Sequence, residues 1–72
     1  MSETTDRVLA ALTDWLLWEG YPPSRQELAG HAGLSEATVD IHLKRLRQAG
    51  LVTWKARATR GLKVVGMEEI GE

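Results

Sequence analysis

The stretch SRQELAGHAGLSEATVDIHLKRLRQAG, residues 24–50, decides the fold because it contains the start and stop signals of two consecutive helices. Ser24 and Glu27 form the pattern Ser-x-x-Glu, a capping box in which each side chain binds a backbone N–H group at a helix start. This pattern predicts a short helix over residues 25–32. Gly30 inside it costs about 1 kcal/mol relative to alanine, and it either permits close helix packing or is simply tolerated.

A second helix follows after a short turn. Gly33 suits the left-handed residue of the turn, and Ser35 suits the N-cap of a helix over residues 36–49. We expect His42 to pack beside the buried stripe of this helix or to hydrogen-bond to the first helix of the chain. The stripe consists of residues spaced i, i+4 and i+7: Val39, Leu43 and Leu46. Two helices joined by a short glycine-containing turn predict a helix-turn-helix.

Upstream of this motif, apolar residues also recur at helical spacing. The pattern predicts a helix that begins after a threonine cap, at Thr4 or Thr5, and ends at Gly20. Leu17 and Trp18 flank its apolar face, so we expect at least one of them to be exposed, with the following loop covering Trp18 in part. The face itself consists of Val8, Leu9, Leu12, Trp15 and Leu16.

Downstream of the motif, the hydrophobic period changes from that of a helix to that of a strand. LVTWK (residues 51–55) and GLKVV (residues 61–65) are two strand candidates joined by the loop ARATR. We expect Trp54 to pack on the hairpin or a helix rather than on a base. The predicted fold class is mainly α with a small β-hairpin, a winged helix-turn-helix of three helices and a two-stranded wing. The predicted domain spans residues 1–66, followed by an acidic, flexible tail over 67–72.

Length and composition exclude several classes of function. Seventy-two residues form one small domain, and without cysteine there is neither a disulfide nor a thiolate metal site. His31 and His42 have no flanking carboxylate at ligand spacing, so we expect no metal and no cofactor. No nucleophile, base and orienting group can be assembled, which argues against an enzyme. No apolar run is long enough to cross a bilayer and the N-terminus is acidic, so we expect a cytoplasmic protein without a membrane partner.

The formal net charge of −1 conceals an uneven distribution. Residues 1–24 contain four acids and one arginine, and residues 66–72 contain three acids and no base. Residues 25–65 contain eight lysines and arginines against three acids. A basic middle segment of this kind favours a nucleic-acid partner.

Four segments of the chain, taken in order, resemble the N-terminal DNA-binding domain of LexA repressors. They are GYPPSRQELA, the turn GLS, HLKRLRQAGLV and ATRGLKV, and the similarity covers roughly residues 5–65. The family binds palindromic operators as a dimer and represses transcription with its third helix in the major groove. The resemblance therefore implies a sequence-specific repressor that binds double-stranded DNA, with a homodimer as a possible partner state and no small-molecule effector evident.

The resemblance also implies which residues contact DNA. Base contacts would come from Ser35, Ala37, Thr38, Asp40 and Ile41, and phosphate contacts from Arg25 and Arg60. The charge pattern adds phosphate contacts from Lys44, Arg45 and Arg57 and from the helix start at Ser24, with the wing on the backbone or in the minor groove.

Two acids, Glu36 and Asp40, lie near the start of the predicted recognition helix. Asp40 could accept a hydrogen bond from cytosine N4, whereas Glu36 more simply stabilises the helix dipole. Ala37, Thr38 and Ile41 could contact thymine methyl groups.

The chain departs from the family pattern at several points. The turn before the third helix is one residue shorter, and Asp40 is followed by Ile41 where the family commonly has a second acid. A serine–lysine peptidase domain, which completes the family's repressors, is not found in these 72 residues, so autocleavage is not implied. The alternative function, favoured by the acidic termini, Glu36 and Asp40, is a winged-helix protein-interaction module that does not bind DNA.

Overall fold

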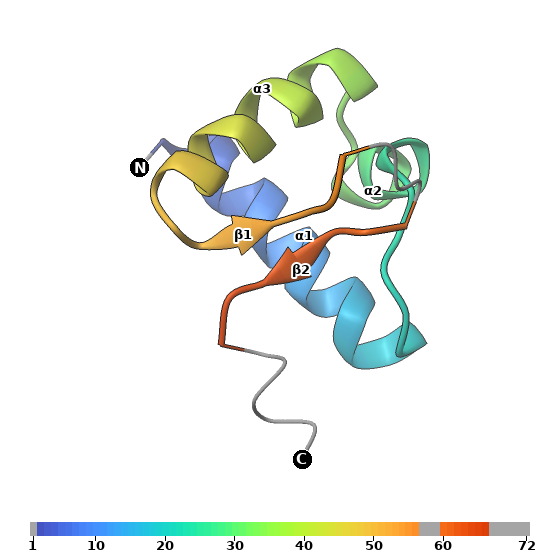
Figure 1. Ribbon diagram of the computed structural model, residues 1–72. Coiled ribbons are helices and arrows are strands. Elements are labelled where there is room, and N and C mark those ends of the chain that lie inside the picture. Colours follow the sequence, from blue (N-terminus) through green and yellow to red (C-terminus); the bar gives the residue numbers. More distant parts are fainter. Residues whose placement is uncertain (1, 57–59, 67–72) are drawn as a thin grey trace.

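The computed structural model describes residues 2–56 and 60–66, and these residues form three helices followed by a two-stranded hairpin (Figure 1). This arrangement confirms the predicted winged helix-turn-helix. The predicted tail over 67–72 lies outside the described residues. The elements are α1 (Glu3–Glu19), α2 (Arg25–Ala32), α3 (Glu36–Gln48), β1 (Val52–Thr53) and β2 (Lys63–Val64).

Helix α1 begins earlier than predicted. Ser2 is its N-cap, and the Ser2 hydroxyl accepts a hydrogen bond from the backbone N–H of Thr5 at 3.1 Å. The predicted threonine cap is therefore wrong. Thr5 is instead buried inside α1, and its hydroxyl is hydrogen-bonded to Nδ1 of His42 on α3 at 2.7 Å. The same hydrogen bond confirms the expected contact between His42 and the first helix, and Gly20 ends α1 in the left-handed conformation as predicted.

The caps of α2 and α3 form as the sequence predicts. The Ser24 hydroxyl accepts from the Glu27 N–H at 3.1 Å, and the Glu27 carboxylate accepts from the Ser24 N–H at 2.9 Å. Gly33 closes α2 with a φ of 71°, and the Ser35 hydroxyl accepts from the Thr38 N–H to begin α3. Helix α3 ends at Gln48, one residue before the predicted end.

The role of Gly30 is also settled by its surroundings. A Cβ atom built on Gly30 would meet no atom within 4 Å, apart from its own helix backbone and chain neighbours. Close helix packing therefore does not require a glycine at this position, and Gly30 is tolerated.

The core lies where all three helices and the hairpin meet. The predicted stripe of α3 is fully buried, and Val52 and Leu62 bring the two arms of the hairpin onto it. The buried hydrophobic residues that form this core are Val8, Ala11, Leu12, Leu28, Ala29, Val39, Leu43, Leu46, Val52 and Leu62. No helix among the described residues is long and apolar enough to span a bilayer.

A second prediction about α1, the partial covering of Trp18, is also wrong. Trp18 is 80% exposed rather than covered by the loop after α1, and Leu17 beside it is 70% exposed. The Trp18 indole N–H donates to the Asp14 carboxylate at 3.1 Å, one turn earlier, and this bond keeps the ring along α1. Trp15, which the sequence places on the apolar face of this helix, is half-buried.

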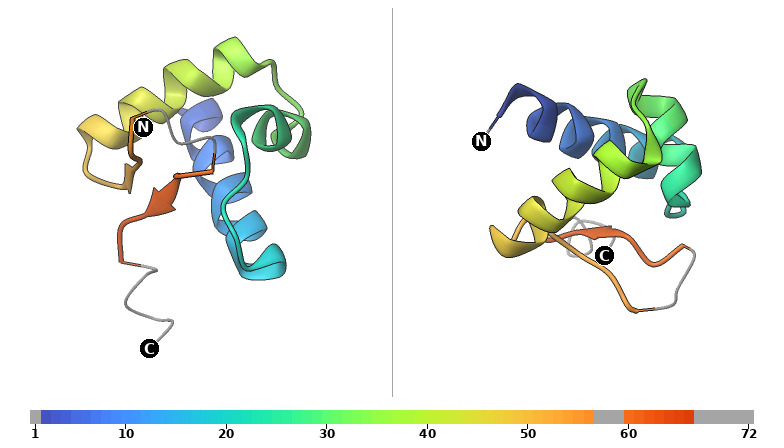
Figure 2. Two further views of the ribbon diagram at one scale, coloured as in Figure 1. Left: turned by 45° about the vertical axis from the view of Figure 1, so that its right-hand side comes forward. Right: turned by 90° about the horizontal axis from the view of Figure 1, so that it is seen from above.

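The hairpin is shorter than the two strand candidates. Only Val52 pairs with Val64 and Thr53 with Lys63, in antiparallel register. From the end of α3 the chain runs beside the helices toward α2 and returns, as Figures 1 and 2 show. This course places Arg60 close to the start of α2.

Candidate nucleic-acid interface

The outward face of α3 lies opposite its buried stripe. With about 3.6 residues per turn, Ala37, Ile41 and Lys44 fall on one line, and Arg45 and Gln48 lie beside it. All five side chains are exposed, and Ile41 is 53% exposed. The face therefore combines two small or aliphatic side chains near the start of the helix with cations farther along. Such a surface can present apolar contacts to base edges and charge to phosphates.

The first turn of α3 is ordered by its own side chains. The Ser35 hydroxyl donates to the Thr38 hydroxyl at 2.9 Å as well as accepting from the Thr38 N–H. Both predicted base-contacting hydroxyls are thus paired with each other in this structure. Glu36 is exposed in the first turn, where an acid is favourable to the helix dipole.

Asp40 is engaged by two cations. Its Oδ1 lies 3.6 Å from Nε of Arg25 at the start of α2, and its Oδ2 lies 3.0 Å from Nζ of Lys44, one turn along α3. The pairs bring together three predicted site residues that come from two helices. They also place Asp40 on the flank of α3 that faces α2, beside the outward face rather than in its middle.

Trp54 extends this cluster to the wing. The guanidinium carbon of Arg47 lies 4.3 Å from the Trp54 ring centroid, and that of Arg25 lies 5.1 Å from it. Both distances are within the range of a cation–π interaction. Trp54 is half-buried and packs against the core, as the sequence predicts.

Arg60 is also held against the start of α2, through Glu27 and the segment before the helix. Its guanidinium forms an ion pair with Glu27, donates to the carbonyl oxygen of Pro22 at 3.2 Å and lies 5.3 Å from the Tyr21 ring centroid. The hydrogen bond from Arg60, together with that from the Ser24 N–H, lowers the pKa of Glu27 from 4.5 to about 2. The pKa of Arg60 is raised, first of all by its hydrogen bond to Glu27.

Three further predicted site residues differ in their surroundings. Arg45 is exposed, and within residues 2–56 and 60–66 it makes no ion pair or side-chain hydrogen bond. Ser24 uses its hydroxyl as a helix cap. Arg57 lies outside the described residues.

Three residues of this surface, Arg47, Glu27 and Tyr21, are not among the site residues predicted from the sequence. Arg47 lies seven residues after Asp40, which places both on the same flank of α3, so helical spacing could have grouped them. Glu27 was interpreted only as half of a capping box. Its second partner, Arg60, is distant in the chain, and no local pattern indicates that contact.

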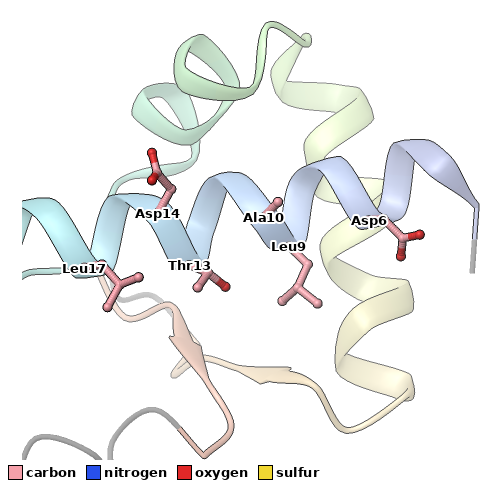
Figure 3. A pocket seen from close by; sticks show the side chains of 6 residues that line it. All are labelled: Asp6, Leu9, Ala10, Thr13, Asp14 and Leu17. Atoms are coloured by element: carbon pink, nitrogen blue, oxygen red, sulfur yellow. The ribbon is translucent and has the colours of Figure 1, made fainter.

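A different feature lies on the far side of α1. Figure 3 shows the side chains that line a shallow pocket on this face of α1: Asp6, Leu9, Ala10, Thr13, Asp14 and Leu17. The carboxylate of Asp14 is also 2.9 Å from Nε2 of His31 on α2. Within the part of the chain that the structure describes, no three His, Asp or Glu side chains form a group that could hold a metal ion.

The sequence of the chain matches a known protein family. The family model described as "LexA DNA binding domain" matches residues 1–61. LexA repressor 1 of Geobacter sulfurreducens is 36% identical over 61 residues, which cover 83% of this chain and 30% of the relative. The LexA repressor of Geotalea uraniireducens is 38% identical over 61 residues, covering 82% of this chain and 30% of the relative. That of Clostridium botulinum is 42% identical over 48 residues, covering 65% and 24%. The chain thus spans less than a third of the length of these relatives.

Proposed function

The chain belongs to the family of LexA DNA-binding domains, and from that membership we propose that it is a sequence-specific transcriptional repressor that binds double-stranded DNA. In this proposal α3 enters the major groove, and the wing lies on the backbone or in the minor groove. The observation that carries the proposal is the outward face of α3, which presents exposed Ala37 and Ile41 beside Lys44 and Arg45.

Base recognition would come from the start of that face. The major groove is wide enough to admit an α-helix, and thymine presents a methyl group there. Ala37 and Ile41 are suited to contact such methyl groups because both are exposed and apolar. Ser35 and Thr38 would contact bases only after exchanging the hydrogen bond between their hydroxyls for one to DNA.

Affinity would come from phosphate contacts. Lys44 and Arg45 lie on the outward face of α3, and Arg25 lies beside it on α2. Each phosphate that such a cation neutralises releases counterions from DNA, which favours binding. Arg60 would act differently, since its guanidinium is already engaged by Glu27 and Pro22. We propose that it contributes chiefly by holding the wing in place. A single module of this size makes a modest interface, so the proposal includes a homodimer on a palindromic site.

Selection of duplexes from a random-sequence pool tests the proposal. The wild-type chain should enrich one sequence, bind it more tightly than a scrambled duplex, and lose affinity steeply as salt rises. Lys44→Ala should weaken binding to both duplexes and reduce the slope of log affinity against log salt by about 1.

The matched control is Arg7→Ala. It removes one exposed cation from α1, away from the outward face of α3, and should change affinity little. If no duplex is enriched at low salt, or if Arg7→Ala and Lys44→Ala weaken binding equally, the proposed geometry is wrong.

The second candidate is a protein-interaction module, and the exposed Trp18 and Leu17 favour it. Both lie at the C-terminal end of α1, where Leu17 also lines the shallow pocket of Figure 3. Exposed large apolar side chains of this kind are typical of surfaces that bind proteins. This candidate predicts that no duplex is enriched, so the same selection separates the two functions.

A further inference from the structure

Building on the proposed DNA-binding function, we propose that Asp40 and Trp54 are positioning residues for Arg25. They hold the Arg25 guanidinium where it binds a DNA phosphate, and Asp40 does not read a base. This assignment replaces the cytosine contact that the sequence suggested for Asp40. It leaves apolar base contacts to Ala37 and Ile41 on the outward face of α3.

The ion pairs of Asp40 show that its carboxylate is already engaged by cations. Both carboxylate oxygens already have a cationic partner, Nε of Arg25 at 3.6 Å and Nζ of Lys44 at 3.0 Å. Reading cytosine would require the carboxylate to share these oxygens between its two cations and the base. The positive charges of both partners also offset the repulsion between an acid and nearby phosphates.

Asp40 also lies to one side of the outward face of α3. Asp40 lies three residues after Ala37 and one before Ile41, so at about 100° per residue it falls well to one side of the line through these two side chains. Its partner Arg25 comes from α2, which fixes that side as the one between the two helices. A carboxylate there is placed to orient a side chain from α2.

The contacts of Arg25 leave part of its guanidinium available to a phosphate. Asp40 engages Arg25 through Nε, and the Trp54 ring lies 5.1 Å from its guanidinium carbon. Its two terminal amino groups make no hydrogen bond to any residue that the structure describes, and the side chain retains 27% of its exposure. Arginine binds phosphate through two parallel N–H groups, and these terminal groups can supply them.

Trp54 adds the wing to this arrangement. Its ring has Arg47 at 4.3 Å as well as Arg25, so side chains from α2 and α3 meet on one residue of the hairpin. Two cations, Arg25 and Lys44, thus contact the Asp40 carboxylate, and a third, Arg47, lies over the Trp54 ring. The excess of positive charge keeps the cluster attractive to a phosphate, while Asp40 offsets part of the repulsion among the cations.

A double-mutant cycle tests the inference with the duplex that the wild type selects. In the wild-type background, Arg25→Ala should weaken binding several-fold and reduce the salt slope by about 0.9, the value for one phosphate contact. In an Asp40→Asn background, Arg25→Ala should cause a much smaller loss and leave the slope unchanged, because the guanidinium is no longer held. Equal losses in the two backgrounds would overturn the inference.

Two further readouts separate positioning from base reading and from a merely structural role. Selection with Asp40→Asn should return the same preferred sequence as the wild type, and a change confined to one base pair would overturn the inference in favour of base reading. Trp54→Phe, which keeps an aromatic ring, should retain most of the affinity. Trp54→Leu should reduce the effect of Arg25→Ala, as Asp40→Asn does, and an undiminished effect would contradict the role of the ring.

A measurement without DNA tests the same contact. The Nε–H of Arg25 should give a distinct 15N–1H NMR signal in the wild type, and Asp40→Asn should shift or broaden it while the amide spectrum of the core stays unchanged. An unchanged Arg25 signal would overturn the inference. If the wild type binds no duplex at all, the proposed function fails and the phosphate role fails with it. Duplex binding with additive mutational effects overturns the inference alone.

Discussion

One carboxylate, that of Glu27, both caps α2 and forms an ion pair with Arg60 at the far end of the wing. The start of the helix-turn-helix and the wing are therefore tied by the same side chain. This contact has a consequence for stability that depends on pH.

The pKa of Glu27 is lowered from 4.5 to about 2, mainly by the hydrogen bond from Arg60. Because the folded-state value lies below the unfolded one, the stabilisation is complete above pH 4.5 and is lost as the pH falls toward 2. We expect the free energy of unfolding of the wild type to exceed that of Glu27→Gln above pH 4.5, and the difference to shrink toward pH 2. Urea denaturation across this pH range measures it. A difference that stays constant with pH would contradict the ion pair, and Glu36→Gln, an exposed acid of α3, is the control.

Gly30 and Gly33 should respond in opposite directions to the same substitution. Gly30→Ala should stabilise the protein by about 0.5–1 kcal/mol, because Gly30 is in an exposed helical position with space for a methyl group. Gly33→Ala should destabilise it by about 1 kcal/mol or more, because φ at Gly33 is +71° and an L-residue is strained there. Thermal and urea unfolding compare the two. Effects of the same sign would show that the turn geometry is wrong.

Thr5→Val should destabilise the protein by about 1–3 kcal/mol, since it leaves a partly buried nitrogen of His42 without its partner at 2.7 Å. The substitution keeps the shape of the side chain, so cavity formation contributes little. Urea denaturation measures the loss. The control is Thr4→Val, the same chemical change at a half-buried neighbour without a side-chain hydrogen bond within the described part of the chain. Equal stability of the two variants would exclude a structural role for the hydrogen bond.

Leu43→Ala should cost about 2–5 kcal/mol, because Leu43 is fully buried between the helices. Leu17→Ala removes the same atoms from a side chain that is 70% exposed, and it should change the free energy of unfolding by less than about 0.5 kcal/mol. Because both variants lose the same atoms, the difference between their free energies of unfolding reports the effect of burial. A large loss on Leu17→Ala would instead indicate that α1 is covered in solution, as in a dimer.

The sequence predicted those parts of the fold that are encoded locally. Ser24, Glu27 and Ser35 mark the helix starts because each satisfies backbone groups within three residues. The cap of α1 was assigned wrongly because the segment SETTD offers several residues with a suitable hydroxyl. Thr5 was among them, but it is occupied by His42, which lies 37 residues away in the chain. A contact with that separation leaves no local pattern.

The candidate site shows the same division. The cations and small side chains of α3 were found from periodicity and from the resemblance to LexA repressors. The pairing of Asp40 with Arg25, and of Arg60 with Glu27, was not found, because each contact depends on how α2 packs against α3 or against the wing. Trp18 is also more exposed than predicted. A hydrogen bond to Asp14 holds its ring along α1, away from the loop that was expected to cover it.

The central claim is that the outward face of α3 contacts duplex DNA. The most direct test is an NMR titration of the 15N-labelled chain with the duplex selected by the wild type, with every assigned amide followed. We predict the largest shifts at Ala37, Ile41 and Lys44 and at the start of α2, with small shifts along the exposed side of α1. Shifts concentrated around Leu17 and Trp18, or no shifts at low salt, would contradict the account.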